Sequence, residues 1–293
     1  MTDRERSLFD PAGGSRMSCQ HKVNRDMDIV VPGFSIRDDE KKLRDFRIAS
    51  GGKGFGIAID LGTTLIALYL VDLESGEIIS QHAFVNPQMP FGGDVMSRLE
   101  AAKKDRNRRM MTDLIRRRVA EVITYAICKN RINRDDVGRL FVAGNTAITH
   151  FWLGRGGEGL EKAPFRSVFE GKGIIPFDPA IVGLTKRCGS EVCPILSGFI
   201  GGDTTSAIIA ADLDMSTGSS RQRLLIDLGA NGEIVLSANG GLFATSTAAG
   251  PAFEGVGMLA GMPALPGAIE GFTERHEPVV IGGGRPVGFC AVV

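Results

Sequence analysis

Short apolar segments alternate with glycine-containing turns in the early part of the chain. They predict three strands, at residues 57–60, 65–72 and 78–84, which tight turns connect. Because such short turns reverse the chain direction, we expect the three strands to form an antiparallel meander. From residue 106 to residue 132 the apolar residues instead recur every three or four positions, which predicts a long helix with one buried face.

The later part of the chain predicts alternating strands and helices. A short apolar strand at residues 140–143 is followed by a helix that begins at Asn145 and Thr146 and runs through Trp152. Another strand is predicted at residues 194–199. The sequence Gly-Gly-Asp then opens a helix over residues 204–213. Strands that alternate with helices indicate an α/β fold.

The opening pattern returns near the end of the chain and is the most informative feature of the sequence. The first copy has Asp-Leu-Gly-Thr-Thr at residues 60–64, between its first and second strands. The second copy has Asp-Leu-Gly-Ala-Asn-Gly at residues 227–232, again between two predicted strands, and a third strand follows at residues 242–246. Two similar halves predict two lobes that face each other across a cleft.

Glycine turns of this kind suit the binding of a phosphate group. A tight turn lets successive backbone N–H groups converge on one anion, and the two threonines of the first turn add hydroxyl donors. One such turn alone is more often an ordinary hairpin turn, but its repetition in the same three-strand setting favours the functional interpretation. The candidate phosphate-binding residues are Gly62, Thr63, Thr64, Gly229, Ala230, Asn231 and Gly232.

Asp60 and Asp227 end the strands before the two turns, so we expect their carboxylates to point at the same space. Carboxylates suit a hard cation such as Mg²⁺, and we expect the contact to run through water because Mg²⁺ gives up its waters reluctantly. The ion would bridge phosphate oxygens and offset their charge. The sequence therefore predicts one Mg²⁺–phosphate site that both aspartates flank.

Three further positions have a structural and a functional interpretation. Asp203 opens a predicted helix, where it either caps the first turn or orients and deprotonates an attacking water. Thr204 and Thr205 could cap in its place. Asn145 either caps its helix only or also faces the cleft, and Gly202 is a candidate for contact with a nucleotide. Asp203 is the catalytic candidate of this set.

Other signals favour structural roles. Six arginines between residues 106 and 118 are interpreted as a solvated helix face. His150 lies on an apolar helix and is interpreted as a packed histidine. Cys188 and Cys193 are interpreted as structural cysteines, because an iron–sulfur cluster normally takes four ligands.

The composition is that of a globular protein in a reducing compartment. The 293 residues are 43% apolar and 23% charged, which predicts a packed core. The formal net charge is zero, which predicts no attraction to nucleic acid or to an anionic membrane. The chain starts without an apolar run, and its five cysteines include no Cys-x-x-Cys pair. We expect a cytoplasmic protein with a polar tail or linker over residues 1–53.

With these residues placed, the chain resembles the ATP-binding fold of actins, sugar kinases and heat-shock chaperones. Residues 60–64 are similar to the first phosphate loop of that superfamily, residues 227–232 to its second, and residues 201–213 to the helix that connects its lobes. The resemblance implies a two-lobed, ribonuclease H-like α/β fold of the actin and sugar kinase ATPase class, with ATP and Mg²⁺ as cofactors. The first lobe would cover residues 54–213, and an incomplete second lobe residues 222–293.

Within this superfamily the chain resembles the reductive activators of corrinoid proteins over about residues 55–290. Members of that family use ATP to help return an inactive cobalt(II) corrinoid to the active cobalt(I) state. The resemblance implies an ATP-binding module that hydrolyses ATP in the complete protein, with a methyltransferase-type corrinoid protein as partner; a homodimer is left open. The segments that carry it are IAIDLGTTLIALYLVDLESGEI, NPQMPFGGDVMSRL, VAGNTAITHFWLG, LIDLGANGEIVL and AAGPAFEG.

Two departures from the family pattern change the expectation. Such activators carry an iron–sulfur domain or obtain electrons from a separate protein. Here only Cys19 lies in the first 50 residues, so we expect a separate or missing iron–sulfur electron donor. The second lobe is short, which predicts loose packing and exposed apolar surface after about Pro263, a well-ordered first lobe and poor nucleotide affinity.

Two alternatives stay open. A small-molecule kinase of the same fold would use Asp203 as the base toward a substrate hydroxyl, and phosphate release without an acceptor would distinguish an activator from it. A non-catalytic fragment would bind a partner without turnover. Calorimetric titration with ATP and Mg²⁺ would identify that case.

Overall fold

The computed structural model describes residues 37–38, 52–213, 222–229, 231–248, 259–262, 266–273 and 275–290. The chain divides into two compact units, one formed by Ser35–Glu254 and the other by Met1–Phe34 together with Gly255–Val293. Most of the tail predicted at residues 1–53 lies outside the described residues. Among the described residues, no helix has the length and apolar character needed to cross a bilayer.

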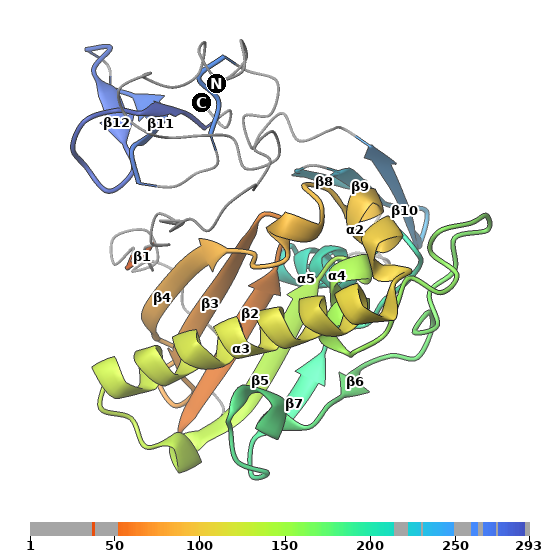
Figure 1. The fold of residues 1–293 in the computed structure, drawn as a ribbon, viewed down its shortest axis with the longest axis horizontal. Helices are drawn as coiled ribbons and strands as arrows, with labels where there is room; N and C mark the ends of the chain where they lie inside the picture. The colour runs from red at the N-terminus through yellow and green to blue at the C-terminus, as the bar shows by residue number, and fades with distance from the viewer. Residues whose placement is uncertain are drawn as a thin grey trace, which may run out of the picture. The chain divides into compact units, whose positions relative to one another are not determined.

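The larger unit contains a seven-stranded mixed sheet (Figure 1). As predicted, β2 (Phe55–Leu61), β3 (Leu65–Asp72) and β4 (Ile78–Val85) form an antiparallel meander. β5 (Val137–Gly144) pairs in parallel with β2, and β7 (Gly189–Val192) pairs in parallel with β5. The strand order is β1-β4-β3-β2-β5-β7-β6, with β1 (Arg37–Asp38) and β6 (Ile175–Pro176) at the edges. This order is the ribonuclease H-like arrangement that the sequence predicts.

The prediction of a strand at residues 194–199 is wrong. β7 ends at Val192, and the chain after it turns without adding a strand to the sheet. Pro194 has no N–H group to donate to a strand ladder. The Ser197 hydroxyl accepts hydrogen bonds from the backbone N–H groups of Phe199 (3.3 Å) and Ile200 (3.1 Å). These local bonds stabilise a turn in place of a strand.

The long helix α3 (Asp105–Lys129) crosses one face of the sheet, close to the predicted range (Figure 1). Its apolar residues stand three and four positions apart, so they share the face that packs on the strands. Each fully buried aliphatic side chain contributes about 1.5–3 kcal/mol. The buried residues are Met111, Ile115, Val119, Val122, Ile123, Ala126 and Ile127.

Shorter helices belong to the same unit. α4 (Thr146–Trp152) and α5 (Gly202–Ala210) lie close to their predicted ranges, whereas α2 (Val95–Ala102) was not predicted. The Asp94 carboxylate caps α2 by accepting a hydrogen bond from the Ser97 N–H (2.9 Å). Short 3-10 helices occupy Met89–Phe91, Arg134–Asp136 and Pro179–Val182.

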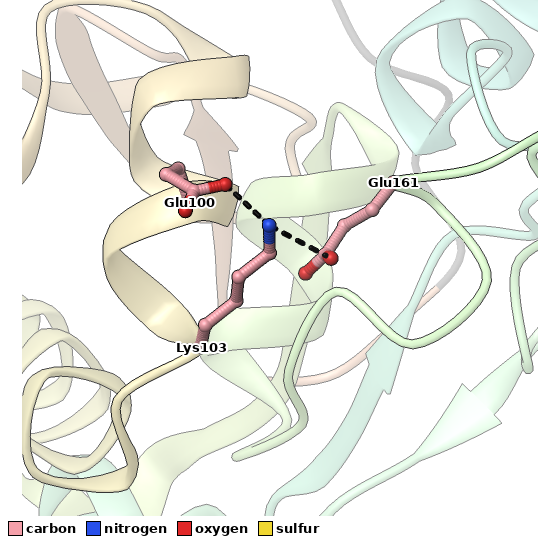
Figure 2. A network of polar contacts seen from close by, with 3 residues as sticks. All are labelled: Glu100, Lys103 and Glu161. Atoms are coloured by element: carbon pink, nitrogen blue, oxygen red, sulfur yellow. Dashed lines mark hydrogen bonds and ion pairs between the residues drawn. The ribbon is translucent and has the colours of Figure 1, made fainter.

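A surface ion-pair network joins the end of α2 to a later loop (Figure 2). The Lys103 ammonium contacts a carboxylate oxygen of Glu100 and lies 3.6 Å from one of Glu161. The Lys103 side chain is 49% exposed and that of Glu100 72%. Exposed pairs of this kind contribute about 0–1 kcal/mol, so the network adds little to the stability of α2.

The predicted second meander is present as β8 (Arg223–Leu228), β9 (Asn231–Ala238) and β10 (Gly241–Ala248). The Arg223 guanidinium ties it to the end of α5 by donating to the carbonyl oxygens of Ala211 (2.6 Å) and Asp212 (3.1 Å). The apolar cluster between them is small, and other apolar side chains stay exposed. The cluster consists of Ile208, Leu213 and Val235, and the exposed residues include Leu224, Ile226, Leu228 and Phe243.

The smaller unit contains β11 (Ala268–Phe272), β12 (Pro278–Val280) and β13 (Gly288–Phe289). β11 lies between the other two strands, antiparallel to β12 and parallel to β13. The apolar exposure predicted after about Pro263 is confirmed for the described residues of this unit. Its buried cluster is Ala268, Ile281 and Cys290, and its exposed apolar residues include Phe272, Val279 and Val287.

Ile115→Ala should lower the free energy of unfolding by about 2–5 kcal/mol, because Ile115 is fully buried between α3 and the sheet. Urea denaturation followed by circular dichroism measures the change. Met110→Ala on the same helix is the control, because Met110 is 42% exposed. It should change the stability by less than about 1 kcal/mol. Equal losses in the two variants would contradict the buried face of α3.

Candidate functional site

Two parallel strands of the large sheet end side by side. β2 ends at Leu61, which pairs in register with Gly144 at the end of β5. The first glycine turn therefore follows β2 at the place where Asn145 follows β5. The carboxyl ends of neighbouring parallel strands are a common position for ligand sites in α/β folds.

The first turn requires glycine at its first position. A Cβ atom on Gly62 would lie 2.2 Å from the carbonyl oxygen of Leu65, which is closer than any real contact. The chain can therefore fold back tightly from β2 into β3. Thr63 and Thr64 form the connection between β2 and β3.

Three successive carbonyl oxygens of this turn accept hydrogen bonds from the segment after β4. The Gly62 oxygen accepts from the Asn86 side-chain amide (2.8 Å), and the Thr64 oxygen accepts from the Asn86 backbone N–H (2.8 Å). The Thr63 oxygen accepts from the Arg98 guanidinium (2.7 Å). In a trans peptide the C=O and N–H groups point in opposite directions. The N–H groups of Thr63 and Thr64 therefore point away from this segment.

Arg98 is fully buried, on the face of α2 that carries Leu99 and Ala102. Besides its contact with Thr63, its Nε donates to the Gly92 carbonyl oxygen (2.9 Å). Burial lowers the pKa of the guanidinium to about 10, so Arg98 stays protonated at neutral pH. A buried charge is costly unless hydrogen bonds compensate it, and these carbonyl oxygens do so.

Gln88 connects Asn86 and Arg98 to helix α3. Its backbone N–H donates to the Asn86 Oδ1 (2.9 Å), and its Nε2 donates to the Met111 carbonyl oxygen on α3 (3.2 Å). Its Oε1 lies 3.5 Å from the Arg98 Nη1. All three side chains are buried. Asn86, Gln88 and Arg98 are called the buried polar network below.

Asn145 has the capping role that the sequence predicts and a further contact with the first turn. Its Oδ1 accepts the backbone N–H of Ile148 (3.0 Å), so Asn145 is the N-cap of α4. Its Nδ2 donates to the Thr63 Oγ1 (2.9 Å). Because the Thr63 hydroxyl oxygen accepts this bond, the hydroxyl hydrogen of Thr63 can be donated to another partner.

Helix α5 begins against the start of α4 and carries Asp203 in its first turn. A Cβ atom on Gly201 would lie 2.7 Å from the Asn145 Cα, so glycine permits this close approach. Gly201 is the N-cap, and Gly202 is buried beside it. The Asp203 Oδ1 accepts the Thr204 N–H (2.7 Å). Asp203 is therefore not the N-cap, although one of its oxygens satisfies a first-turn donor.

Four carboxylates interact electrostatically in the larger unit. Burial, and then the charges of Asp203 and Asp227, raise the pKa of Asp60 to about 6. Burial raises the pKa of Asp203, and the charge of Asp227 adds to this effect. Glu233 lies opposite Asp227 in the β8–β9 ladder, and burial and the charges of Asp203 and Asp227 raise its pKa. The structure thus brings the three predicted aspartates together and adds Glu233.

Asp60 is closely surrounded by protein atoms, yet it remains exposed to solvent, as does Asp227. Water reaches both residues and screens part of the repulsion between them. The cost of this repulsion to stability is therefore smaller than in a dry interior. A dissolved ion can reach the same carboxylates.

The second turn closes through the Gly229 N–H, which donates to the Asn231 carbonyl oxygen (2.9 Å). Gly232 lies in β9, opposite Leu228 and Thr247. Ala230 lies outside the described residues, as do residues 249–258 after β10. The binding role of this turn stays a prediction.

Metal ligation also stays a prediction. Among the residues that the structure describes, no three His, Cys, Asp or Glu side chains are grouped to hold a metal ion. The Mg²⁺ contact expected from the sequence runs through water and does not need such a group. Carboxylate oxygens are nevertheless the donors that this ion prefers.

The structural interpretations of His150 and the cysteine pair are confirmed. His150 is fully buried, and its ring nitrogens lie 2.7 Å from the Gly156 carbonyl oxygen and 2.7 Å from the Ser167 hydroxyl. Burial lowers its pKa, which favours the neutral ring. Cys188 and Cys193 are buried and form no disulfide, and burial raises the pKa of both thiols.

Models of one protein family match both repeats of the chain. The RACo middle region matches residues 55–216, and the C-terminal domain of RACo, the ASKHA domain, matches residues 221–292. The chain belongs to the RACo family. Because ASKHA proteins share the actin and sugar kinase fold, the predicted fold class is confirmed.

Individual RACo relatives agree with this assignment. The chain is 34% identical over 247 residues to the corrinoid activation enzyme RamQ of Eubacterium limosum, covering 80% of this chain and 40% of RamQ. It is 31% identical over 228 residues to the [Co(II) methylated amine-specific corrinoid protein] reductase of Methanosarcina barkeri, covering 73% of this chain and 40% of that protein.

A solved RACo structure shows the same fold. The reductive activator for corrinoid, iron-sulfur protein is 30% identical and superimposes with a TM-score of 0.71. The match covers 83% of this chain and 39% of that one. The chain thus spans about two fifths of the length of these RACo relatives.

The buried polar network and Glu233 were not predicted from the sequence. A signal for Arg98 is present, because it stands three positions after Val95 and four before Ala102. This spacing places a charged residue on the apolar face of a helix. A signal for Glu233 is its position two residues after the second turn's Asn231, on a predicted strand next to Asp227.

In metal-free buffer, Asp60→Asn should make the protein more stable than the wild type at pH 7, and the difference should vanish below about pH 4. The folded pKa of about 6 exceeds the ordinary value of 3.8. The folded state therefore binds the proton more tightly, and wild-type stability falls as pH rises from about 4 to about 6. Thermal unfolding from pH 3.5 to 8 measures this, and a pH-independent difference would contradict it.

Proposed function

We propose that this chain is the nucleotide-binding part of an ATP-dependent reductive activator of a corrinoid protein. The observation that carries the proposal is the first turn, in which the N–H groups of Thr63 and Thr64 point away from the donors that hold the carbonyl oxygens. Successive backbone donors on the open side of a turn suit a phosphate group. Membership of the RACo family supports the same function.

The carboxylates beside this turn fit Mg²⁺ as part of the proposed site. Asp60 and Asp227 would hold the ion through water, and the bound ion would offset phosphate charge. The mutual repulsion that contributes to the raised pKa of Asp60 is relieved when a cation is nearby. The proposed nucleotide contacts are Gly62, Thr63, Thr64, Asn145, Gly202, Gly229, Ala230, Asn231 and Gly232.

Asp203 is the proposed general base for hydrolysis. One of its oxygens accepts the Thr204 N–H, and the carboxylate has a second oxygen that can accept a proton from water. The water oxygen bonds to the terminal phosphorus as the bond from that phosphorus to the bridging oxygen breaks. ADP leaves, and Asp203 takes the proton. The raised pKa of Asp203 makes it a stronger base than an ordinary aspartate.

The corrinoid partner is proposed from the names of the relatives. One is a corrinoid activation enzyme, and the other is a reductase of a Co(II) corrinoid protein. By this proposal ATP binding and hydrolysis assist reduction of Co(II) to Co(I) in a partner corrinoid protein. The electron comes from an iron–sulfur donor that is separate from, or missing in, this stretch of sequence.

Asp203→Asn should slow hydrolysis of Mg·ATP by about 10²–10⁴-fold, because it removes the proton acceptor and keeps the shape of the side chain. Release of phosphate from millimolar ATP measures the rate. Binding of Mg·ATP should persist in the variant. Asp105→Asn is the matched control, because Asp105 is also a first-turn acid, on the exposed start of α3. Hydrolysis that is equally slow in both variants would refute the role of Asp203.

Asp60→Ala should weaken Mg²⁺-dependent ATP binding by at least about tenfold, because the ion loses one flanking carboxylate. Isothermal titration with ATP, with and without Mg²⁺, measures the effect. Binding that is as tight in the variant as in the wild type would exclude Asp60 from the Mg²⁺ site. Absence of any wild-type binding at millimolar ATP would refute the proposed function of the chain.

A further inference from the structure

We propose that Arg98 is a positioning residue for phosphate binding. Its guanidinium fixes the direction of the Thr63–Thr64 peptide and supplies a buried positive charge behind the first turn. This inference rests on the proposed function, which it deepens. The reasons are the hydrogen bonds of the turn, the buried charge of Arg98 and the way α2 holds Arg98.

The turn can present either N–H groups or carbonyl oxygens to a ligand, depending on the orientation of its peptide planes. A flip of the Thr63–Thr64 peptide would direct a carbonyl oxygen at the phosphate and remove a donor. That flip breaks the hydrogen bond from the Arg98 Nη2 to the Thr63 oxygen (2.7 Å). Charge-assisted bonds of this kind are about twice as strong as neutral ones. Arg98 therefore favours the orientation that binds an anion.

Arg98 also places a positive charge behind the first turn. Asp60, Asp203, Asp227 and Glu233 make the region negative, which by itself repels a phosphate. Among the described residues, no ion pair joins Arg98 to a carboxylate, and Asp94 is the acidic residue whose charge acts on it. The Arg98 guanidinium is hydrogen-bonded directly to the Thr63 carbonyl oxygen of the turn. It therefore attracts an anion bound on the other side of that turn.

The position of Arg98 is itself fixed. Asp94 caps α2 through the Ser97 N–H (2.9 Å), and the Arg98 Nε donates to the Gly92 carbonyl oxygen at the entry to the helix (2.9 Å). Gln88 connects the same group to α3 through the Met111 carbonyl oxygen. These bonds leave the guanidinium little freedom to move away from Thr63.

Arg116 offers a matched control in the same unit. Like Arg98 it is an arginine of a helix, although it is half-buried where Arg98 is fully buried, and its Nε donates to the Trp152 carbonyl oxygen (2.9 Å). Burial lowers its pKa, as it does for Arg98. Trp152, which accepts this hydrogen bond, is the last residue of α4 and is not part of the first turn. Loss of either arginine should destabilise the fold, but only loss of Arg98 should affect the turn.

The experiment compares Arg98→Met and Arg98→Lys with Arg116→Met and Arg116→Lys. Amide hydrogen exchange at Thr63 and Thr64, without ligand, reports the order of the turn, and thermal unfolding reports the stability of the whole protein. Titration with Mg·ATP reports binding. Arg98→Met should speed exchange at the turn by about tenfold or more and weaken binding by a similar factor. Arg98→Lys should fall between, because it keeps the charge without the planar fork.

The Arg116 variants should leave exchange at the turn and Mg·ATP binding within about twofold of the wild type, even where the thermal stability falls. If Arg98→Met does not fold, Arg98→Lys carries the test, because it keeps the positive charge and loses the planar fork that donates to the Gly92 and Thr63 oxygens. It should also speed exchange at the turn.

Unchanged exchange at the turn in the Arg98 variants, or an equal change in the Arg116 variants, would overturn the inference. The two proposals fail differently. If the wild type binds no Mg·ATP but exchange at the turn changes only in the Arg98 variants, the proposed function is refuted. The inference that Arg98 orders the turn then still holds. Binding that weakens without any change at the turn would refute the positioning role and leave the function.

Discussion

The hydrogen bonds from the buried polar network to the first turn are the constraint on which the site depends. Gly62 permits the tight turn, but it does not decide which way the peptide groups point. Asn86 and Arg98 decide this by engaging three successive carbonyl oxygens. The segment between β4 and α3 thus acts as the support of a turn that lies far earlier in the sequence. The surface network around Lys103 has no comparable role, because its charges are exposed.

The same site combines fixed donors with carboxylates that repel one another. Burial and like charges raise the pKa of Asp60 and Asp203, so the empty site is electrostatically unfavourable. Backbone donors alone would suit any small anion, and carboxylates alone would suit any hard cation. Their combination suits a phosphate that arrives with a divalent ion. This complementarity is the physical basis for the proposed function.

Local patterns predicted most of the fold, and tertiary contacts explain the failures. The meanders, α3 and the Asn145 cap follow from apolar spacing and capping chemistry within short segments. The strand at residues 194–199 failed because the Ser197 hydroxyl closes a turn there. Arg98 was missed because burial of a charged residue depends on partners distant in the sequence, here the Thr63 oxygen. The approach of Asp60 to Asp227 follows from the repeat, but the addition of Glu233 required the β8–β9 register.

The account is tested most directly by locating bound nucleotide with Mn²⁺·ATP in an NMR experiment on the wild-type chain. The paramagnetic ion broadens the amide signals of nearby residues. We expect broadening at Thr63, Thr64 and Gly229, which lie beside Asp60 and Asp227 in the sequence, and sharp signals at the C-terminal end of α3, which leads to the start of β5. Broadening centred instead on the surface cavity that Lys103, Arg108, Glu158, Glu161, Lys162 and Arg166 line would place the nucleotide elsewhere and contradict the account.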